Sequence, residues 1–290
     1  MGLLDNKVAI VTGAGGGIGR QYALALAREG AKIVVNDLGC PREGEGSSKE
    51  PAEKVVNEIK AMGGEAVPNF DSVATMEGGQ RIFQTAMDSF GKVDILVNNA
   101  GILRDKSFVN MTEEMWDSVI AVHLKGTFCV TKPVFKYMKE RGGPGKIINT
   151  SSTSGLFGNF GQANYGAAKA GIAGFTRVLA LEGKKYGITV NGLLPVAYTR
   201  LTEDLPAFKD KDKDLDPAFI SPVVVWLASD EANDVTGHFF LIRGGTVELV
   251  YVARKPIAEK PIEEGPWRPG DIGKKILEKL KDFQPVNKGF

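Results

Sequence analysis

The sequence predicts an α/β fold of the Rossmann type, a doubly wound parallel sheet of about seven strands with helices on both faces. Short apolar, β-branched runs alternate with helical patterns along most of the 290 residues, as they do in parallel sheets with crossover helices. A glycine-rich stretch, Thr12–Gly19, joins the first such run to the first helical pattern. The hydrophobic content of 43% is sufficient for one large core.

The expected elements follow one another in a regular order. Because crossovers between parallel strands are nearly always right-handed, the helices should cover both faces of the sheet. The expected strands are Lys7–Thr12, Lys32–Asn36, Glu65–Phe70, Val93–Asn98, Lys146–Thr150, Thr189–Leu194 and His238–Ile242. The expected helices lie near Ile18–Glu29, Ala52–Met62, Met76–Phe90, Thr112–Arg141, Ala163–Tyr186 and Pro217–Ser229.

Three segments interrupt this order. Gly39–Pro51 is polar and rich in glycine, which predicts a surface loop. Leu201–Asp216 is charged and contains proline, and we expect a substrate lid at about residues 200–216. We expect residues 1–250 to form the cofactor-binding domain. Residues 251–290 should form a C-terminal extension, helical near Asp271–Phe283, that is not an independent domain.

Composition argues against several classes of partner. The net charge of +1 creates no global field that would attract nucleic acid or a membrane surface. No stretch approaches the roughly 18 apolar residues of a membrane helix. Cys40 and Cys129 form no metal-type or redox pair, and His123 and His238 are the only histidines. We therefore expect a cytoplasmic protein that binds no nucleic acid, membrane or metal.

The glycines after the first strand predict a dinucleotide site. Gly13 permits a tight turn, and Gly17 and Gly19 let the backbone approach a diphosphate and let helix pack on strand. The start of the following helix offers unpaired N–H groups to phosphates. The alternative is a glycine-rich turn without a ligand, but its position between the first strand and the first helix favours the cofactor site.

Asp37 ends the second strand, about 20 residues beyond these glycines. A carboxylate there can accept hydrogen bonds from the adenosine ribose, and it would repel a 2′-phosphate. One charge pair at ~4 Å is worth roughly 4 kcal/mol at an effective dielectric of ~20. Leu38 and Gly39 follow and bring no compensating cation. We therefore expect NAD rather than NADP; the alternative is that Asp37 only caps a loop.

Ser152, Tyr165 and Lys169 are the expected catalytic residues. Tyr165 and Lys169 lie four residues apart on one predicted helix face, and Ser152 follows the fifth strand. A phenol has a pKa of ~10, and an ammonium at 4–5 Å can lower it by about two to three units. Tyr165 should act as acid/base and Ser152 should hold the substrate oxygen, so these two residues form the substrate-binding pair. Lys169 should also contact the nicotinamide ribose; otherwise the pair is a partly buried tyrosine beside a surface lysine.

With these motifs, the sequence resembles the short-chain dehydrogenase/reductase family over roughly residues 5–245. TGAGGGIG, Asn98-Asn99-Ala100-Gly101, Ser152 and Tyr165-Gly166-Ala167-Ala168-Lys169 match the family pattern in order. The resemblance implies an oxidoreductase that interconverts a secondary alcohol and a ketone. Besides Gly13, Gly17, Gly19, Asp37, Tyr165 and Lys169, it implies cofactor contacts by Ile18, Asp71, Ser72, Asn98, Val196, Ala197, Tyr198 and Thr199.

Within the family, the chain most resembles the (3R)-hydroxyacyl-CoA dehydrogenase domains of peroxisomal multifunctional enzymes type 2. This resemblance depends on VVNDLG (34–39), NNAGILRDKSF (98–108) and GNFGQANY (158–165). It implies oxidation of a 3-hydroxyacyl-CoA to a 3-oxoacyl-CoA in lipid metabolism. Basic residues of the extension could meet the CoA phosphates, or could form an ordinary solvated face; they are Arg254, Lys255, Lys260, Arg268, Lys274 and Lys275.

The resemblance also implies a homo-oligomer, a dimer or tetramer. Apolar residues of the expected helices Thr112–Arg141 and Ala163–Tyr186 could pack across a dimer face or belong to the core; they are Phe128, Val130, Phe135, Phe175 and Val178.

Two positions depart from the family pattern. His123 stands where many members have an asparagine that supports a water relay to the lysine, and Pro195-Val196 replaces Pro-Gly. His123 could carry a proton or be structural. Two alternative functions therefore stay open: a steroid or cyclic-alcohol dehydrogenase of the same family, and a non-catalytic subunit that binds the cofactor.

Overall fold

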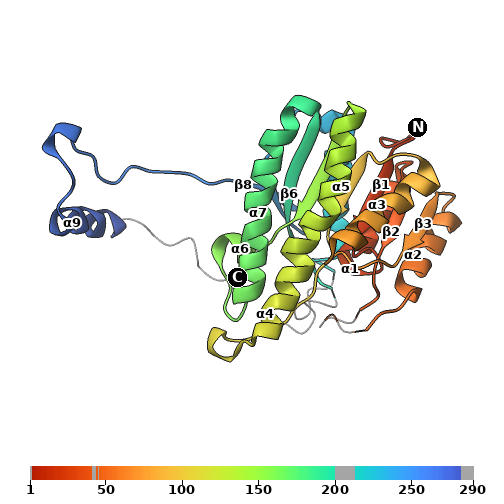
Figure 1. Cartoon of the computed structure of the whole chain (residues 1–290), viewed down its shortest axis with the longest axis horizontal. Helices are drawn as coiled ribbons and strands as arrows, with labels where there is room; N and C mark the ends of the chain where they lie inside the picture. The colour runs from red at the N-terminus through yellow and green to blue at the C-terminus, as the bar shows by residue number, and fades with distance from the viewer. Residues whose placement is uncertain (1, 41–43, 45, 200–212, 282–290) are drawn as a thin grey trace. The chain divides into compact units, whose positions relative to one another are not determined.

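The computed structural model describes residues 2–40, 44, 46–199 and 213–281. Its central feature is a sheet of eight strands in the order β3-β2-β1-β4-β5-β6-β7-β8 (Figure 1). All neighbouring strands are parallel except β7 and β8. The strands are β1 Val8–Thr12, β2 Lys32–Asn36, β3 Ala66–Asn69, β4 Ile95–Asn98, β5 Gly145–Thr150, β6 Ile188–Val196, β7 Phe239–Arg243 and β8 Thr246–Val250.

Helices cover both faces of this sheet, as the sequence predicts. One apolar core joins the sheet to α1, α2 and α8, and a second core on the opposite face joins it to α3, α5 and α7. The helices are α1 Gly17–Arg28, α2 Glu50–Ala61, α3 Met76–Phe90, α4 Glu113–Ile120, α5 Gly126–Arg141, α6 Thr153–Phe157, α7 Ala163–Gly183, α8 Ser221–Ala228 and α9 Pro269–Leu280.

The strand order reverses between β1 and β4. From β1 the chain moves outward through β2 to β3, then returns to place β4 on the other side of β1. Open α/β sheets bind ligands at such a switch point, beyond the carboxyl ends of the strands. Thr12, Asn98, Thr150 and Val196 end four strands at this edge of the sheet. The fold therefore brings the glycine loop, the NNAG segment and the expected catalytic serine to the same edge.

The eighth strand is the main difference from the expected sheet. β8 pairs antiparallel with β7 through a two-residue connection, Gly244-Gly245, in which Gly244 has a φ of +50°. A glycine pair between two apolar runs is a hairpin signal. Most of β8 is exposed, Val247 and Leu249 included, and this five-residue run after the glycine pair is not among the expected strands.

The expected helix Thr112–Arg141 is interrupted. Residues Ala121–Lys125 form a π-helical turn between α4 and α5. Such turns carry one extra residue and are frequent at functional sites. Hydrophobic periodicity does not resolve them, because the same apolar face continues on both sides. The short helix α6 was also not expected, since five residues are too few for a periodic pattern.

The chain divides into two compact units, residues 1–250 and 251–290. The second unit contains α9, which spans Pro269–Leu280 where a helix near Asp271–Phe283 is expected; residues 282–283 are outside the described part. Most of the expected lid, residues 200–212, also lies outside it. No helix in the described ranges is both long and apolar enough to cross a bilayer.

Candidate active site

The glycine loop is fixed by the NNAG segment of the neighbouring strand. Asn99 donates its side-chain amide to the carbonyls of Thr12 and Gly13, each at 3.1 Å. In return, the Thr12 hydroxyl accepts the backbone N–H groups of Asn99 and Ala100. Gly13 has a φ of +64°, and a Cβ there would lie 2.7 Å from the Ala100 Cα. Glycine is therefore required at position 13 by conformation and by close packing.

The loop fits a diphosphate at the start of α1. Gly17 has a φ of +51°, and Gly16 has no heavy atom within 4 Å of where a Cβ would stand. Gly16 precedes the helix and provides no side-chain cap, so among the described residues the position of its Cβ is open before the first turn. A Cβ on Gly19 would lie 2.1 Å from the Gly13 carbonyl oxygen, so close packing leaves no room for a side chain at position 19. Ile18 is half-buried against the core.

Asp37 closes the adjacent side of the loop. Its two carboxylate oxygens accept the N–H groups of Gly15 and Gly39, both at 2.7 Å. The carboxylate thus holds the glycine loop as well as standing at the end of β2. Two N–H donors occupy only part of the acceptor capacity of a carboxylate, which leaves capacity for ribose hydroxyls.

Two further expected cofactor residues, Asp71 and Ser72, are placed by a polar cluster around β3. Asp71 accepts from Asn69 at 2.9 Å and pairs with Arg81, and the Ser72 hydroxyl accepts the Ala74 N–H. Both residues follow β3 at the carboxyl edge.

Asn98 lies deeper. Its amide donates to Thr131 and to Asn149, each at 2.8 Å, and its exposed fraction is 5%. The side chain of Asn98 therefore joins the sheet to α5 rather than opening toward the edge.

Val196 to Thr199 lie across the opening from the glycine loop. Val196 ends β6, Ala197 is buried, and the Tyr198 N–H donates to the Leu215 carbonyl. The Thr199 methyl would stand 3.7 Å from a Cβ on Gly17. Segments about 180 residues apart in the sequence thus lie close together at this edge of the sheet.

The three expected catalytic residues converge at the end of β5. Ser152 is the N-cap of α6, and its hydroxyl accepts the Ser154 N–H at 3.2 Å. Tyr165 and Lys169 lie one turn apart in α7, with the Lys169 Nζ 5.5 Å from the centre of the Tyr165 ring. The Ser152 hydroxyl is near enough to the Tyr165 phenol to act on its pKa. Lys169 donates to the Thr150 carbonyl at 2.6 Å, which ties the helix to the strand.

Burial controls the protonation of this group. It raises the pKa of Tyr165 to about 12, the hydrogen bond with Ser152 acts to lower it, and the charge of Asp105 acts to raise it. Burial lowers the pKa of Lys169 to about 7. The sequence analysis expects the Lys169 ammonium to lower the pKa of Tyr165. In the protein alone, desolvation outweighs that effect, because a charged form is costly where water is excluded.

His123, which replaces the asparagine of many relatives, lies against Tyr165. The π-helical turn directs its ring inward, where its exposed fraction is 3%. Its Nε2 is 2.8 Å from the Ile102 carbonyl oxygen and 3.1 Å from the Ile102 nitrogen. Burial and the charge of Lys169 lower its pKa to about 3. His123 is therefore neutral near pH 7 and is not equipped to accept a proton there.

A second layer of polar residues, not anticipated from the sequence, holds the start of α7. Asn164 is fully buried; it donates to the carbonyls of Arg104 and Met115 and accepts the Tyr165 N–H. Gln162 is 7% exposed and bonds Asp105 and Ser154. These residues stand inside NNAGILRDKSF and GNFGQANY, but nothing in the sequence alone shows that the two motifs meet.

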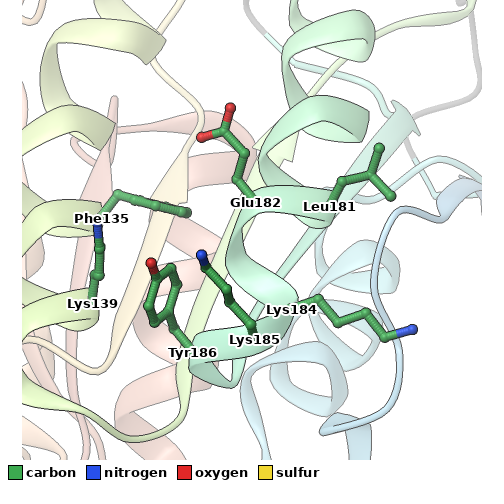
Figure 2. Close-up of a pocket in the computed structure, with 7 residues that line it drawn as sticks. All are labelled: Phe135, Lys139, Leu181, Glu182, Lys184, Lys185 and Tyr186. Carbon is green, nitrogen blue, oxygen red and sulfur yellow. The ribbon is translucent and has the colours of Figure 1, made fainter.

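A surface pocket of about 670 Å³ lies away from this site, and Figure 2 shows lysine side chains around Tyr186 within it. Glu182 lines the pocket at one end of α7, and Tyr165 stands at the other end. At 1.5 Å per residue, they are separated by roughly 25 Å along the helix. The pocket is therefore not part of the Tyr165 site. Its lining residues are Phe135, Lys139, Leu181, Glu182, Lys184, Lys185 and Tyr186.

Comparison with known proteins identifies the family. The profile of the short chain dehydrogenase family matches residues 7–210. The chain is 48% identical over 285 residues to the mouse (Mus musculus) peroxisomal multifunctional enzyme type 2, covering 98% of this chain but only 38% of that enzyme. It is 39% identical over 255 residues to the 3-oxoacyl-[acyl-carrier-protein] reductase FabG of Thermotoga maritima, covering 84% of this chain and 99% of that one.

A crystal structure of a short chain dehydrogenase from Mycobacterium avium shares the fold. It superposes with a TM-score of 0.87 at 45% identity, and the match covers 98% of each chain. Together with the profile match, this likeness shows that the chain belongs to the short-chain dehydrogenase family and is an oxidoreductase that acts on hydroxyl or oxo groups.

Proposed function

We propose that this enzyme interconverts a 3-hydroxyacyl-CoA and a 3-oxoacyl-CoA with NAD as cofactor and Tyr165 as acid/base. One observation carries the proposal: Tyr165 lies one helical turn from Lys169, whose Nζ is 5.5 Å from the centre of its ring, and the Ser152 hydroxyl is near enough to act on the pKa of the phenol. These groups stand at the carboxyl edge of the sheet, where the glycine loop fits a dinucleotide diphosphate. NAD, when bound, would supply the hydride acceptor or donor for this chemistry.

Each side chain has a defined task in this mechanism. Ser152 would hold the substrate oxygen and stabilise the alkoxide, because its hydroxyl lies near the phenol that exchanges the proton. In reduction, Tyr165 donates its proton to the alkoxide oxygen, a role that suits a phenol with a pKa raised to about 12. In oxidation, Tyr165 must first lose its proton. Protonated Lys169 would favour that loss by roughly 3–4 kcal/mol at 4–5 Å and a dielectric of ~20.

Asp37 supports NAD over NADP. The carboxylate accepts hydrogen bonds from the N–H groups of Gly15 and Gly39, and these bonds hold its charge beside the glycine loop. A ribose 2′-phosphate bound at this position would meet that charge directly. The adenosine contacts proposed for Asp71 and Ser72 lie at the end of the next strand, β3.

The choice of an acyl thioester is supported by relatives. The Thermotoga maritima protein is named for a 3-oxoacyl thioester, and the mouse protein matches nearly all of this chain. The sequence also carries NNAGILRDKSF and GNFGQANY, the motifs on which the likeness to hydroxyacyl-CoA dehydrogenase domains depends. The main alternative is a steroid or cyclic-alcohol substrate on the same catalytic group.

A substrate panel tests the proposal. Purified enzyme is assayed by NADH absorbance with (3R)-3-hydroxybutyryl-CoA, a longer 3-hydroxyacyl-CoA, a steroid alcohol and cyclohexanol, each with NAD and with NADP. We expect the highest kcat/KM for an acyl-CoA with NAD. A higher value for the steroid or cyclohexanol would contradict the thioester assignment. Absence of turnover with all four, while NAD binds, would favour the non-catalytic alternative.

Assembly and location are part of the same proposal. We expect a homo-oligomer that uses exposed apolar residues of α5 and α7, among them Phe128 and Val178, which are 41% and 52% exposed. Phe135 and Phe175 are half-buried on the same helices. Val130, which the sequence suggested as a further candidate, is fully buried in the core and cannot contribute. Cys40 and Cys129 form no disulfide, which agrees with the expected cytoplasmic location, although the mouse relative is named as peroxisomal.

A further inference from the structure

Asn164 precedes the catalytic tyrosine in the chain and is fully buried at the start of α7. A buried asparagine destabilises a protein unless its amide is hydrogen-bonded, because the amide gives up its bonds with water. Asn164 is not the cap of the helix, since the N-cap of α7 is Gln162. The reason for an asparagine at this position therefore lies in the groups that its amide binds.

The Asn164 amide directs its nitrogen to two backbone carbonyls. Its Nδ2 donates to the Arg104 carbonyl and to the Met115 carbonyl, each at 3.0 Å. Arg104 belongs to the segment that follows NNAG, and Met115 lies in the first turn of α4. One side chain thus joins the catalytic helix to two segments that stand 60 and 49 residues earlier in the chain.

The Asn164 oxygen binds the backbone of the catalytic residue itself. Its Oδ1 accepts the Tyr165 N–H at 2.7 Å. Tyr165 lies in the first turn of α7, where backbone N–H groups have no carbonyl partner within the helix. Asn164 supplies the missing acceptor. With two carbonyls at Nδ2 and one N–H at Oδ1, only one orientation of the amide satisfies all three bonds.

The segment that Asn164 binds is also anchored to the glycine loop. At one end of this segment, Asn99 donates its side-chain amide to two carbonyls of the loop. At the other end, the Arg104 carbonyl accepts from Asn164. The backbone of Tyr165 is therefore held relative to the loop that fits the cofactor diphosphate, and not only by the other residues of α7.

We infer that Asn164 is a positioning residue that acts through Tyr165, by fixing the backbone of the tyrosine where its phenol meets the substrate oxygen. The inference rests on the proposed function, because it concerns the residue proposed to exchange the proton. A phenol transfers a proton only within hydrogen-bond reach of the oxygen, ~2.6–3.2 Å. A displacement of about 1 Å can lower a rate on the order of a hundredfold. Without Asn164, one buried N–H and two buried carbonyls lose their partner, and the start of α7 shifts to satisfy them.

The test substitution is Asn164→Leu, which keeps a side chain of similar size and removes all three bonds. The matched control is Asn191→Leu in β6. Asn191 is also buried; its amide donates to the Val235 carbonyl at 2.7 Å and accepts the His238 N–H at 3.1 Å. The control therefore loses the same kind of bonds between β6 and the segment before β7, which the proposed mechanism does not use. Both variants should melt below the wild type.

The measured quantities are kcat on the best substrate of the panel, the dissociation constant of NAD and the melting temperature. All assays are made at a temperature at which every variant is folded. We expect Asn164→Leu to lower kcat about tenfold to hundredfold and to leave the dissociation constant of NAD within about twofold. Asn191→Leu should keep kcat within about twofold of the wild type. If Asn164→Leu does not fold, Asn164→Ala replaces it, because the smaller side chain leaves room for water to bond the freed groups.

A double-mutant cycle with Tyr165→Phe separates positioning of the phenol from a general effect on the fold. We expect Asn164→Leu to lower the residual kcat of Tyr165→Phe by less than about twofold, because the group that it positions has already been removed. The fall in melting temperature should be the same in both backgrounds, since the same three bonds are broken in each.

The outcomes separate the inference from the proposed function. An equal fall of kcat in both backgrounds would overturn the inference, because Asn164 would then act on the fold as a whole. An unchanged kcat in Asn164→Leu would also overturn it, as would failure of both Asn164 variants to fold while Asn191→Leu folds. The proposed function survives each of these results as long as Tyr165→Phe loses activity. If Tyr165→Phe keeps the kcat of the wild type, the proposed function fails, and the inference fails with it.

Discussion

The ring of His123 lies edge-to-face against the ring of Tyr165, with centroids 5.2 Å apart and planes inclined by 87°. Such contacts are worth about 0.5–1.5 kcal/mol beyond simple burial. His123 also bonds the Ile102 backbone through Nε2. It therefore links the π-helical turn, the NNAG segment and the catalytic tyrosine through packing rather than through a transferred proton.

The first prediction concerns pH. Because the pKa of His123 is lowered to about 3, the residue should stay neutral from pH 5 to pH 9 and produce no break in the pH dependence of kcat/KM in that range. His123→Asn keeps an amide that can bond Ile102 and should lower kcat by only a few-fold. A break near pH 6 that disappears in this variant would show that His123 does carry a proton.

Gly101 should tolerate no side chain. A Cβ at this position would stand 2.3 Å from the His123 Cε1, so Gly101→Ala must displace the imidazole and with it the Tyr165 contact. We expect a loss of about 1–3 kcal/mol in the free energy of unfolding together with reduced kcat. Gly174→Ala in α7 is the control, because no heavy atom lies within 4 Å there. The melting temperature and kcat of both variants are measured. If Gly101→Ala and Gly174→Ala have the same melting temperature and the same kcat, the predicted clash with His123 is refuted.

Lys169 should be destabilising at the same time as it is needed for activity. Its pKa is about 7 in the folded protein and about 10.4 when unfolded, so the unfolded chain binds more protons between these values. Stability therefore rises with pH across that window, and the penalty for the buried amine is complete below pH 7. Lys169→Met should gain about 2–4 kcal/mol below pH 7, a gain that fades toward pH 10.5, while kcat falls at least about a hundredfold.

Lys146 provides the control for this effect. It is 4% exposed at the opposite end of β5 from Thr150, and burial lowers its pKa to about 8. Lys146→Met should show a smaller gain in thermal stability with the same direction of pH dependence, and it should keep the kcat of the wild type. If Lys169→Met melts no higher than the wild type at pH 6, burial of the Lys169 amine does not destabilise the folded protein.

Asp37→Asn tests cofactor choice. The amide keeps one acceptor oxygen for Gly15 or Gly39 but removes the charge that would repel a 2′-phosphate. We expect the ratio of kcat/KM with NAD to that with NADP to fall about tenfold or more, mainly through a better KM for NADP. The comparison is made on one substrate at one ionic strength. If the ratio of kcat/KM with NAD to that with NADP is unchanged, Asp37 only holds the glycine loop and does not determine the choice of cofactor.

The sequence was sufficient for strands β1 to β7 and for the convergence of the three expected catalytic residues, for a physical reason. β1 to β7 are short, mostly buried runs, and Ser152, Tyr165 and Lys169 are placed by one strand end and one helix. Hydrophobic pattern does not report on features that depend on tertiary packing. The π-helical turn at His123, the bond from Gln162 to Asp105 and the internal position of Asn98 are of this kind.

The protonation states of Tyr165 and Lys169 were the least predictable property of the site. The spacing of Tyr165 and Lys169 shows that they share a helix face, but the opposing effects of desolvation and charge depend on how completely the fold encloses them. In the protein alone, desolvation dominates for both residues. Strand β8 was also not predicted: it is a run of only five residues, and its apolar residues Val247 and Leu249 are exposed rather than part of the core.

The most direct test of the mechanism is Tyr165→Phe, which removes the phenol hydroxyl and keeps the ring that packs on His123. The measurement pairs kcat on 3-hydroxybutyryl-CoA with the dissociation constant of NAD from fluorescence titration. The account predicts a fall in kcat of about a hundredfold to ten-thousandfold, with NAD affinity and thermal stability close to those of the wild type. A variant that binds NAD normally and turns over at the rate of the wild type would contradict the assignment of Tyr165 as the acid/base.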